Sequence, residues 1–227
     1  MTPVAPTMPR LVWPEGVGPL AGAVGAGAMG AASAIAALGY TGSLGEAYSP
    51  FNHWVSELGE VGVSPLATVF NLGLIAGGLG FGTFMMALSV ARGGRLGSTL
   101  GALGLASGAF GALVGVFPLG QSDLHVPVAA GFFVLGALAV ALASADIARR
   151  PDAASPAWLA AVGAIVVACF VGFIAISGGR ADASLAEARP VFMLEPTLEW
   201  GAVLGTLAWT ALVAATWWRG RGSGTGR

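Results

Sequence analysis

The sequence predicts an all-α, polytopic membrane protein: a six-transmembrane-helix bundle with a short amphipathic helix in the first outer loop. Composition is the first reason, because 56% of the 227 residues are hydrophobic, 9% are charged, and the mean hydropathy is +0.80. The second is that the apolar residues form six runs, each near the roughly 20 residues that a spanning helix needs. The third is that arginines gather between alternate runs.

The six runs account for almost the whole chain, which leaves no room for a separate soluble domain. The first run follows Arg10, but it is too long for the apolar region of a signal peptide, so we interpret it as a retained helix. The predicted organisation is a tail over 1–16, a transmembrane domain over 17–218 and a second tail over 219–227. The runs are Val17–Tyr40, Pro65–Ala91, Leu96–Leu119, Val126–Ile147, Ala157–Ser177 and Thr197–Trp218.

The arginines predict the orientation. With the N-terminus in the cytoplasm, eight of the ten arginines fall on the cytoplasmic side, and only Arg180 and Arg189 fall outside. This bias requires an even number of spans, so both termini are expected in the cytoplasm of a multi-pass protein of the cell membrane. Trp54 and Trp200 are expected at the outer membrane interface, and Trp209, in mid-span, is expected in the packing.

The third run carries glycines on one helical face, which we call the glycine face. Small residues at such spacing allow two backbones to approach closely, so we expect this helix at the centre of the bundle. A chain with 37 glycines also produces such spacing by chance. Shorter pairs of the same kind occur in the first two runs, and such faces are candidate surfaces for homo- or hetero-oligomers. The glycines of the face are Gly97, Gly101, Gly104, Gly108, Gly111 and Gly115.

The first outer loop contains signals for a short helix over Pro50–Leu58. Ser49 suits the N-cap, Pro50 the first turn and Gly59 the end. In that helix His53 and Glu57 would be neighbours one turn apart. The helix either lies on the membrane surface or turns its polar face, which includes Asn52 and Ser56, onto a cavity at the outer mouth of the bundle.

The second outer connection is short and brings Asp123 and His125 to the start of the fourth span. We therefore expect His53, Glu57, Asp123 and His125 to converge at the outer mouth. Their nitrogen and oxygen donors are of the kind that zinc accepts, which makes these four a candidate metal site. The alternative is a hydrogen-bonded polar cluster, with Asn52 and Ser56, that locks the two loops together.

These two segments resemble a bacterial and archaeal membrane family catalogued as domain of unknown function nine hundred and ninety-eight. The resemblance covers the six-helix region and implies no reaction, but it directs attention to the loop helix and the turn before His125. The family is distantly similar to the Frag/DRAM/Sfk group, which is associated with lipid handling and stress responses. The matching residues are Asn52-His53-Trp54-Val55-Ser56-Glu57-Leu58-Gly59, Asn71, Gly115-Val116-Phe117-Pro118, His125 and Ala129.

Several functions fit these features. The first is a protein that binds membrane lipids through their headgroups at the outer polar cluster. The second is a metal-dependent intramembrane hydrolase, with His53, His125 and Asp123 as ligands and Glu57 as general base. A third is a small assembly subunit of a larger membrane complex. A transporter is disfavoured because few ionisable residues lie deep in the spans. Nucleic-acid binding is not expected, because the net charge is −1 and there is no basic run.

The orientation is open to a direct test by cysteine-accessibility labelling of intact cells. A cysteine introduced near Asp182 is expected to react with an impermeant reagent from outside, because the reverse orientation would place eight arginines outside. Labelling of that cysteine only from the cytoplasmic side would reverse the assignment.

Overall fold

The protein is described by a computed structural model covering residues 16–42, 44–177 and 189–222, with side chains described up to residue 220. Six helices in these residues are long and apolar enough to cross a membrane, and each agrees with a predicted span to within a few residues. The predicted tails lie largely outside the described residues, as do Arg180 and Asp182. The elements are α1 (Val17–Leu38), the 3₁₀ helix η1 (Val55–Gly59), α2 (Ala67–Arg92), α3 (Gly94–Val116), α4 (His125–Arg149), α5 (Trp158–Ser177) and α6 (Leu194–Gly222).

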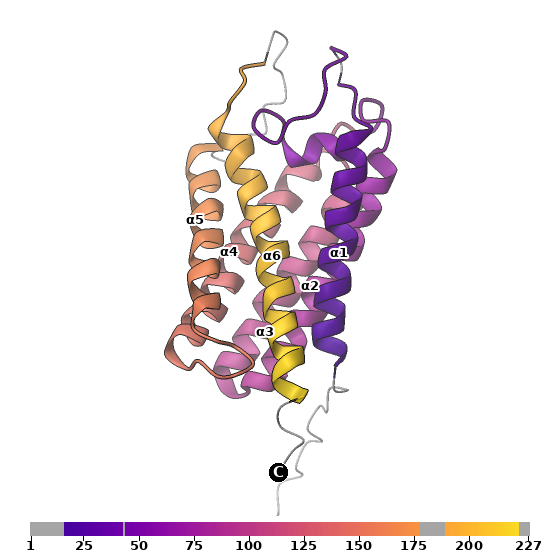
Figure 1. Ribbon diagram of the computed structural model, residues 1–227. Coiled ribbons are helices and arrows are strands. Elements are labelled where there is room, and N and C mark those ends of the chain that lie inside the picture. The colour runs from indigo at the N-terminus through magenta and orange to yellow at the C-terminus, as the bar shows by residue number, and fades with distance from the viewer. Residues whose placement is uncertain (1–15, 43, 178–188, 223–227) are drawn as a thin grey trace, which may run out of the picture.

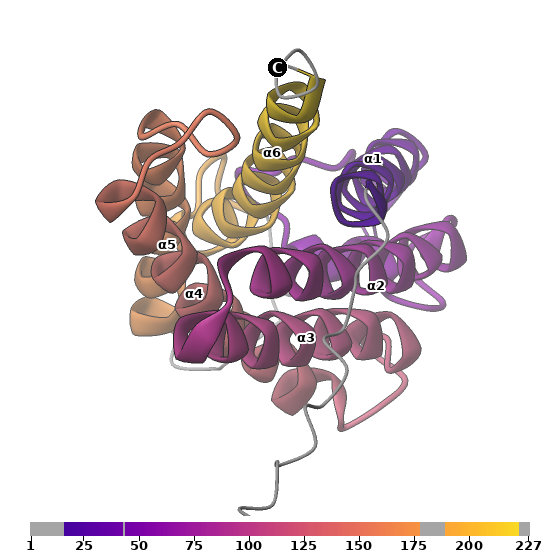
Figure 2. The same cartoon turned by 90° about the horizontal axis from the view of Figure 1, so that it is seen from below.

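The six helices form a ring. Each helix packs against the next along the chain, and α6 returns to pack against α1 (Figure 2). The start of α1 and the end of α6 lie at one end of the bundle, which we call the terminal end (Figure 1). The first loop with η1 lies at the opposite end, which we call the loop end. Neighbours in sequence are thus neighbours in space, as short connections favour.

The glycine face of α3 is confirmed as a packing surface. All six of its glycines are buried, and most lie against α2. A Cβ on Gly108 would lie 2.5 Å from the Gly78 carbonyl oxygen and 2.7 Å from Gly82 Cα. The expectation that α3 is central is wrong, however, because α3 packs mainly against its ring neighbours α2 and α4. The glycines bring two backbones together without requiring helices on every side.

Large side chains fill the interior of the ring towards the terminal end. Trp209 is fully buried, as expected, and packs edge-on against Phe84 of α2, with their ring centroids 6.3 Å apart. At the terminal end itself, Asp146 is buried and paired with Arg92, whose Nε lies 3.0 Å from Asp146 Oδ2, and with Arg150. This end is therefore closed by aromatic packing and ion pairs.

The predicted α-helix over Pro50–Leu58 is wrong. Residues 50–54 form turns, and only the five-residue η1 follows. An α-helix would need the Phe51 carbonyl to accept from the Val55 N–H. Instead, the Phe51 carbonyl accepts from Met193 N at 2.7 Å, and the Val55 N–H donates to Glu199 Oε2 at 2.7 Å. Contacts with the segment leading into α6 and with α6 itself thus replace the local helical bonds.

The tight contact between α2 and α3 predicts a difference between two glycine-to-alanine variants. Gly108→Ala is expected to lower the melting temperature in detergent by several degrees, because the new methyl group meets backbone atoms, an overpacking cost of about 1–3 kcal/mol. Gly27→Ala in α1 is the matched control, because its Cβ would meet nothing within 4 Å. Equal melting temperatures for Gly108→Ala and the unmodified protein would contradict the close packing.

Candidate functional site

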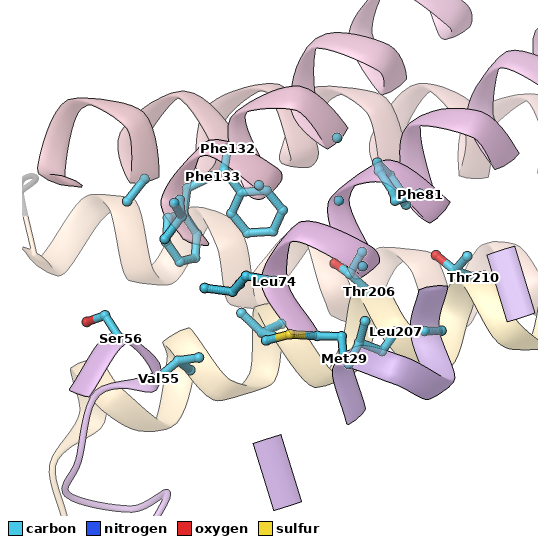
Figure 3. Close-up of a pocket in the computed structure, with 18 of the residues that line it drawn as sticks. Met29, Val55, Ser56, Leu74, Phe81, Phe132, Phe133, Thr206, Leu207 and Thr210 are labelled. Carbon is cyan, nitrogen blue, oxygen red and sulfur yellow. The ribbon is translucent and has the colours of Figure 1, made fainter. Parts of the chain in front are cut away.

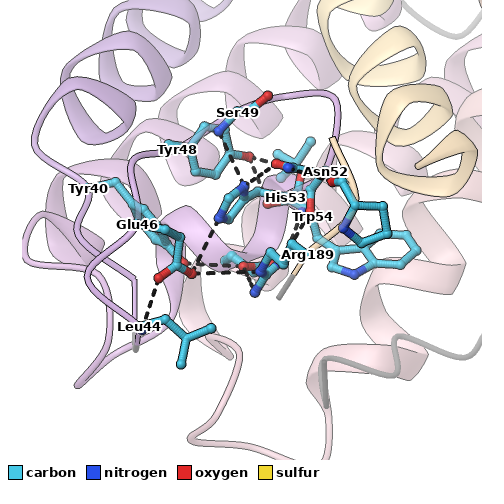
Figure 4. Close-up of polar contacts among 12 residues, drawn as sticks. Tyr40, Leu44, Glu46, Tyr48, Ser49, Asn52, His53, Trp54 and Arg189 are labelled. Carbon is cyan, nitrogen blue, oxygen red and sulfur yellow. Dashed lines mark hydrogen bonds and ion pairs between the residues drawn. The ribbon is translucent and has the colours of Figure 1, made fainter. Parts of the chain in front are cut away.

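Glu57 is the centre of a buried polar cluster at the loop end. Figure 4 shows Tyr40, Glu46, His53 and Arg189 of this cluster. Its carboxylate receives both terminal nitrogens of Arg189, with Nη1 2.9 Å from Oε1 and Nη2 2.8 Å from Oε2. Tyr40 donates its hydroxyl to Oε2 at 3.2 Å, and the Trp54 N–H donates to Oε1 at 3.0 Å. Only 1% of Glu57 is exposed, so these four donors replace the water that a carboxylate needs.

His53 and Glu46 extend this cluster. The Asn52 amide donates to the Pro190 carbonyl at 2.8 Å, so its oxygen faces His53 Nδ1 at a distance of 2.7 Å. His53 Nε2 then lies 3.6 Å from Glu46 Oε1, and Arg189 Nε lies 3.7 Å from the same oxygen. We call Tyr40, Glu46, Asn52, His53, Glu57 and Arg189 the loop-end cluster.

The cluster fixes the charge states of its members. Burial, followed by the adjacent Glu57 charge, raises the pKa of the Tyr40 hydroxyl, so this group stays protonated and donates. Burial opposes the charge of Arg189, but the bonds to Glu57 raise the pKa of the guanidinium nonetheless. Burial also opposes the charge of Glu46, yet the N–H groups of Glu46 and Leu44 lower the pKa of its carboxyl. Arg189 is therefore a permanent cation held between two carboxylates.

The loop-end cluster ties two distant parts of the chain together. Arg189 and Pro190 precede α6, whereas the other members belong to the first loop and its border with α1. Arg189 Nη1 also donates to the Asn52 carbonyl at 3.1 Å, and Met193 N donates to that of Phe51. The first loop is thereby held across the loop end of the ring.

The inner side of η1 is apolar and packs on α2. Val55 and Leu58 are buried among side chains of α1, α2 and α6. The Asn71 amide of α2 donates to the Gly59 carbonyl at 3.0 Å, and a Cβ on Gly59 would clash with Phe70 and Asn71. Gly59 is therefore required by the close approach of η1 to α2, and η1 forms a lid over the ring.

Beneath this lid lies a central cavity with an empty volume of about 810 Å³, including the space through which it opens (Figure 3). Its walls are overwhelmingly apolar and come from η1 and all the helices except α5. Met29 and Leu207 face Phe132 and Phe133 across it, while Ser56 lies at the loop end and Thr210 at the deep end. The lining includes Gly77, Gly78, Gly108 and Gly111, which add no side chain to fill the space.

A second hollow of about 600 Å³, which we call the side groove, lies between α4 and α5 near the loop end. Val126 and Val134 of its lining are exposed on the bundle surface, where the helices would face lipid. The central cavity and the side groove share Ser56, His125, Ala129, Phe133 and Glu199. These shared residues form a common wall between the interior and the outer surface of the bundle.

Three polar side chains stand in that wall. Glu199 of α6 is 6% exposed and accepts from the Val55 N–H of the lid. His125, at the start of α4, donates from Nδ1 to the Phe117 carbonyl at 2.8 Å. Ser56 of η1 makes no hydrogen bond through its hydroxyl to any residue that the structure describes. The apolar space thus has a small polar end at the lid.

A family model matches most of the chain. It is that of the family described as "Protein of unknown function (DUF998)", and the match covers residues 26–218. The chain belongs to this family. No curated protein and no solved structure matches it.

In this DUF998 protein the six predicted site residues occupy different places. His53, Glu57 and Asn52 belong to the loop-end cluster, whereas Ser56 and His125 line the cavity and the side groove. Asp123 is exposed in the turn between α3 and α4. The structure therefore divides the predicted site between a polar cluster and an apolar cavity.

The divided arrangement bears on the zinc hypothesis. Within residues 16–42, 44–177 and 189–222, no three His, Cys, Asp or Glu side chains are grouped so as to hold a metal ion. Glu57 is already surrounded by donors, and His125 Nδ1 is occupied by a carbonyl. A zinc site remains a prediction from sequence without support from this geometry.

Sequence reasoning missed several members of the site. Arg189 appeared only as an exception to the cytoplasmic arginine bias, and that exception was the available signal, because an outer arginine needs a partner. The chain's two tyrosines lie at the loop end, where Tyr40 is buried and Tyr48 is half-buried, and Tyr48 accepts from the indole of Trp200 at 2.8 Å. Trp54 and Trp200 are both buried in the bundle, and Tyr48 also donates its hydroxyl to the Trp54 carbonyl at 2.8 Å.

The Glu57–Arg189 pair predicts strong coupling between the first loop and the segment before α6. Glu57→Gln and Arg189→Gln are each expected to lower the free energy of unfolding by about 3 kcal/mol, because each leaves a buried charge unpaired. The double variant should lose less than the sum of the two, as measured by thermal unfolding in detergent. Arg95→Gln, at an exposed arginine, is the control. Additive losses would show that the two residues act independently.

Proposed function

We propose that this DUF998 protein binds a single membrane lipid, with its hydrocarbon chain in the central cavity and its polar end at Glu199, His125 and Ser56. The observation that carries the proposal is the apolar cavity with one polar end, joined by a shared wall to the lipid-facing side groove. Concave spaces with apolar walls and a few polar groups are typical of small-molecule sites.

The walls explain why a chain rather than water would fill the space. Met29, Leu74, Phe132 and Leu207 offer carbon surfaces without hydrogen-bonding groups, and water needs two or more polar partners to be stable there. A hydrocarbon chain leaving the bilayer gains little hydrophobic energy, since lipid is equally apolar. It does gain dispersion contacts with walls that otherwise face empty space, and these favour occupancy.

The side groove supports entry from the membrane rather than from water. Its exposed Val126 and Val134 lie where the first turns of α4 would face hydrocarbon, close to the loop end. Ala129 and Phe133, one and two turns along α4, belong to both spaces. A lipid chain can therefore move between α4 and α5 without crossing the polar loop-end cluster.

The arginines support a source in the outer leaflet of the cell membrane. Arg92, Arg95, Arg149, Arg150 and Arg219 lie at the terminal end, which we assign to the cytoplasm on the positive-inside rule. The lid, the side groove and the polar end then lie on the outer side. This refines the sequence-based hypothesis, because the proposed headgroup site moves from His53 and Glu57, which belong to the loop-end cluster, to the cavity wall.

The test is photolabelling of purified protein with a long-chain amphiphile carrying a photoreactive group near the end of its chain. Peptide mapping should locate the label on cavity residues such as Met29 or Phe132. Ala129→Phe is expected to reduce labelling about tenfold, because the ring would occupy space common to the cavity and the groove.

The matched control is Leu138→Phe, which places the same ring on the exposed face of α4. Cavity residues of this variant should be labelled to the same extent as those of the unmodified protein. Labels confined to outward-facing residues, with no change in Ala129→Phe, would show that lipid contacts only the outside of the bundle.

A further inference from the structure

We infer that the lipid carries an uncharged hydroxyl headgroup, as a fatty alcohol, a monoacylglycerol or a polyprenol does, and that anionic lipids are rejected. This inference rests on the proposed lipid-binding function and names the chemical class of its ligand. It follows from the hydrogen-bonding capacity and the charge of the three polar residues that the cavity and the side groove share.

Glu199 supplies the strongest of these groups. Oε2 is held by the Val55 N–H of the lid at 2.7 Å, and Oε1 has no hydrogen bond to the described residues. Because the side chain is nearly buried and lines both spaces, its free oxygen is available to a ligand but poorly available to bulk water. A ligand that bonds to this oxygen adds a hydrogen bond in a largely apolar space, and its binding is favoured for that reason.

His125 and Ser56 define what that ligand must present. The Nδ1–H of His125 is committed to the Phe117 carbonyl, so in a neutral ring Nε2 is a hydrogen-bond acceptor. Ser56 has a hydroxyl, which donates and accepts. The wall therefore presents a carboxyl oxygen of Glu199, an acceptor nitrogen of His125 and the hydroxyl of Ser56. A hydroxyl, which both donates and accepts, is the smallest headgroup that can bond to an acceptor and to Ser56 together.

Charge excludes the common anionic headgroups. The chain has no lysine, and no arginine of the described residues lines either space. The nearby cation, Arg189, is already shared between Glu57 and Glu46. A phosphate or carboxylate at the polar end would lie in apolar surroundings without a counter-charge, which is strongly unfavourable. An ammonium headgroup would lose its hydration and find a single carboxyl group as its partner, so its burial is also unfavourable.

The experiment is competition against the photoactivatable amphiphile at neutral pH, with three competitors that share one eighteen-carbon chain: an alcohol, a carboxylic acid and a primary amine. The alcohol is expected to halve labelling of the unmodified protein at a concentration at least tenfold below those of the acid and the amine. An acid or amine that competes equally well overturns the inference, while specific cavity labelling leaves the lipid-binding function standing. Absence of cavity labelling overturns both.

Two conservative variants assign the preference to the polar end. Ser56→Ala should weaken competition by the alcohol about fivefold, because one hydrogen bond is lost. Glu199→Gln keeps an acceptor for Val55 but replaces the other carboxyl oxygen with an amide nitrogen, so the gap between the competing concentrations of alcohol and acid should narrow. Glu195→Gln, one turn away on α6 and lining neither space, should leave the gap unchanged. An unchanged gap in Glu199→Gln would show that Glu199 does not select the headgroup.

Discussion

The arrangement of the loop end depends on one interaction, the two-nitrogen contact between Arg189 and the buried carboxylate of Glu57. Two desolvated charges are stable only when the remaining lone pairs and hydrogens also find partners. Tyr40, the Trp54 backbone and the Asn52 carbonyl supply them, and in doing so they fix the first loop in one position. With that loop fixed, Val55 reaches Glu199, and η1 covers the cavity.

The glycines have two linked effects on the ring. Along α1, α2 and α3 they let backbones approach at distances that a methyl group would prevent, as at Gly25 with Gly80 and at Gly78 with Gly108. Gly77 and Gly111 also line the central cavity, and these two positions add no side chain to it. These glycines therefore allow the helices to associate through close packing, since hydrophobicity does not drive association within lipid. They also leave open the space that we propose for a lipid chain.

Features that depend on local sequence were predictable. The six spans follow from apolar runs, and the packing role of the glycine face follows from its spacing. The α-helix expected over Pro50–Leu58 does not form, because Glu199 and Met193, which are distant in sequence, form hydrogen bonds with backbone groups that the helix would need. His53 and His125 were expected together because both lie outside the spans on one side. Only the fold reveals that one is bonded within a polar cluster and the other stands in a cavity wall.

The proposed lipid chain in the cavity beneath the lid should be visible by cryo-electron microscopy of the protein in nanodiscs made from native membrane lipids. The account predicts an elongated density between Met29 and Phe132, with its polar end within hydrogen-bonding distance of Glu199 or Ser56. A cavity closed by repacked side chains, or one that contains only separate water densities, would contradict the account.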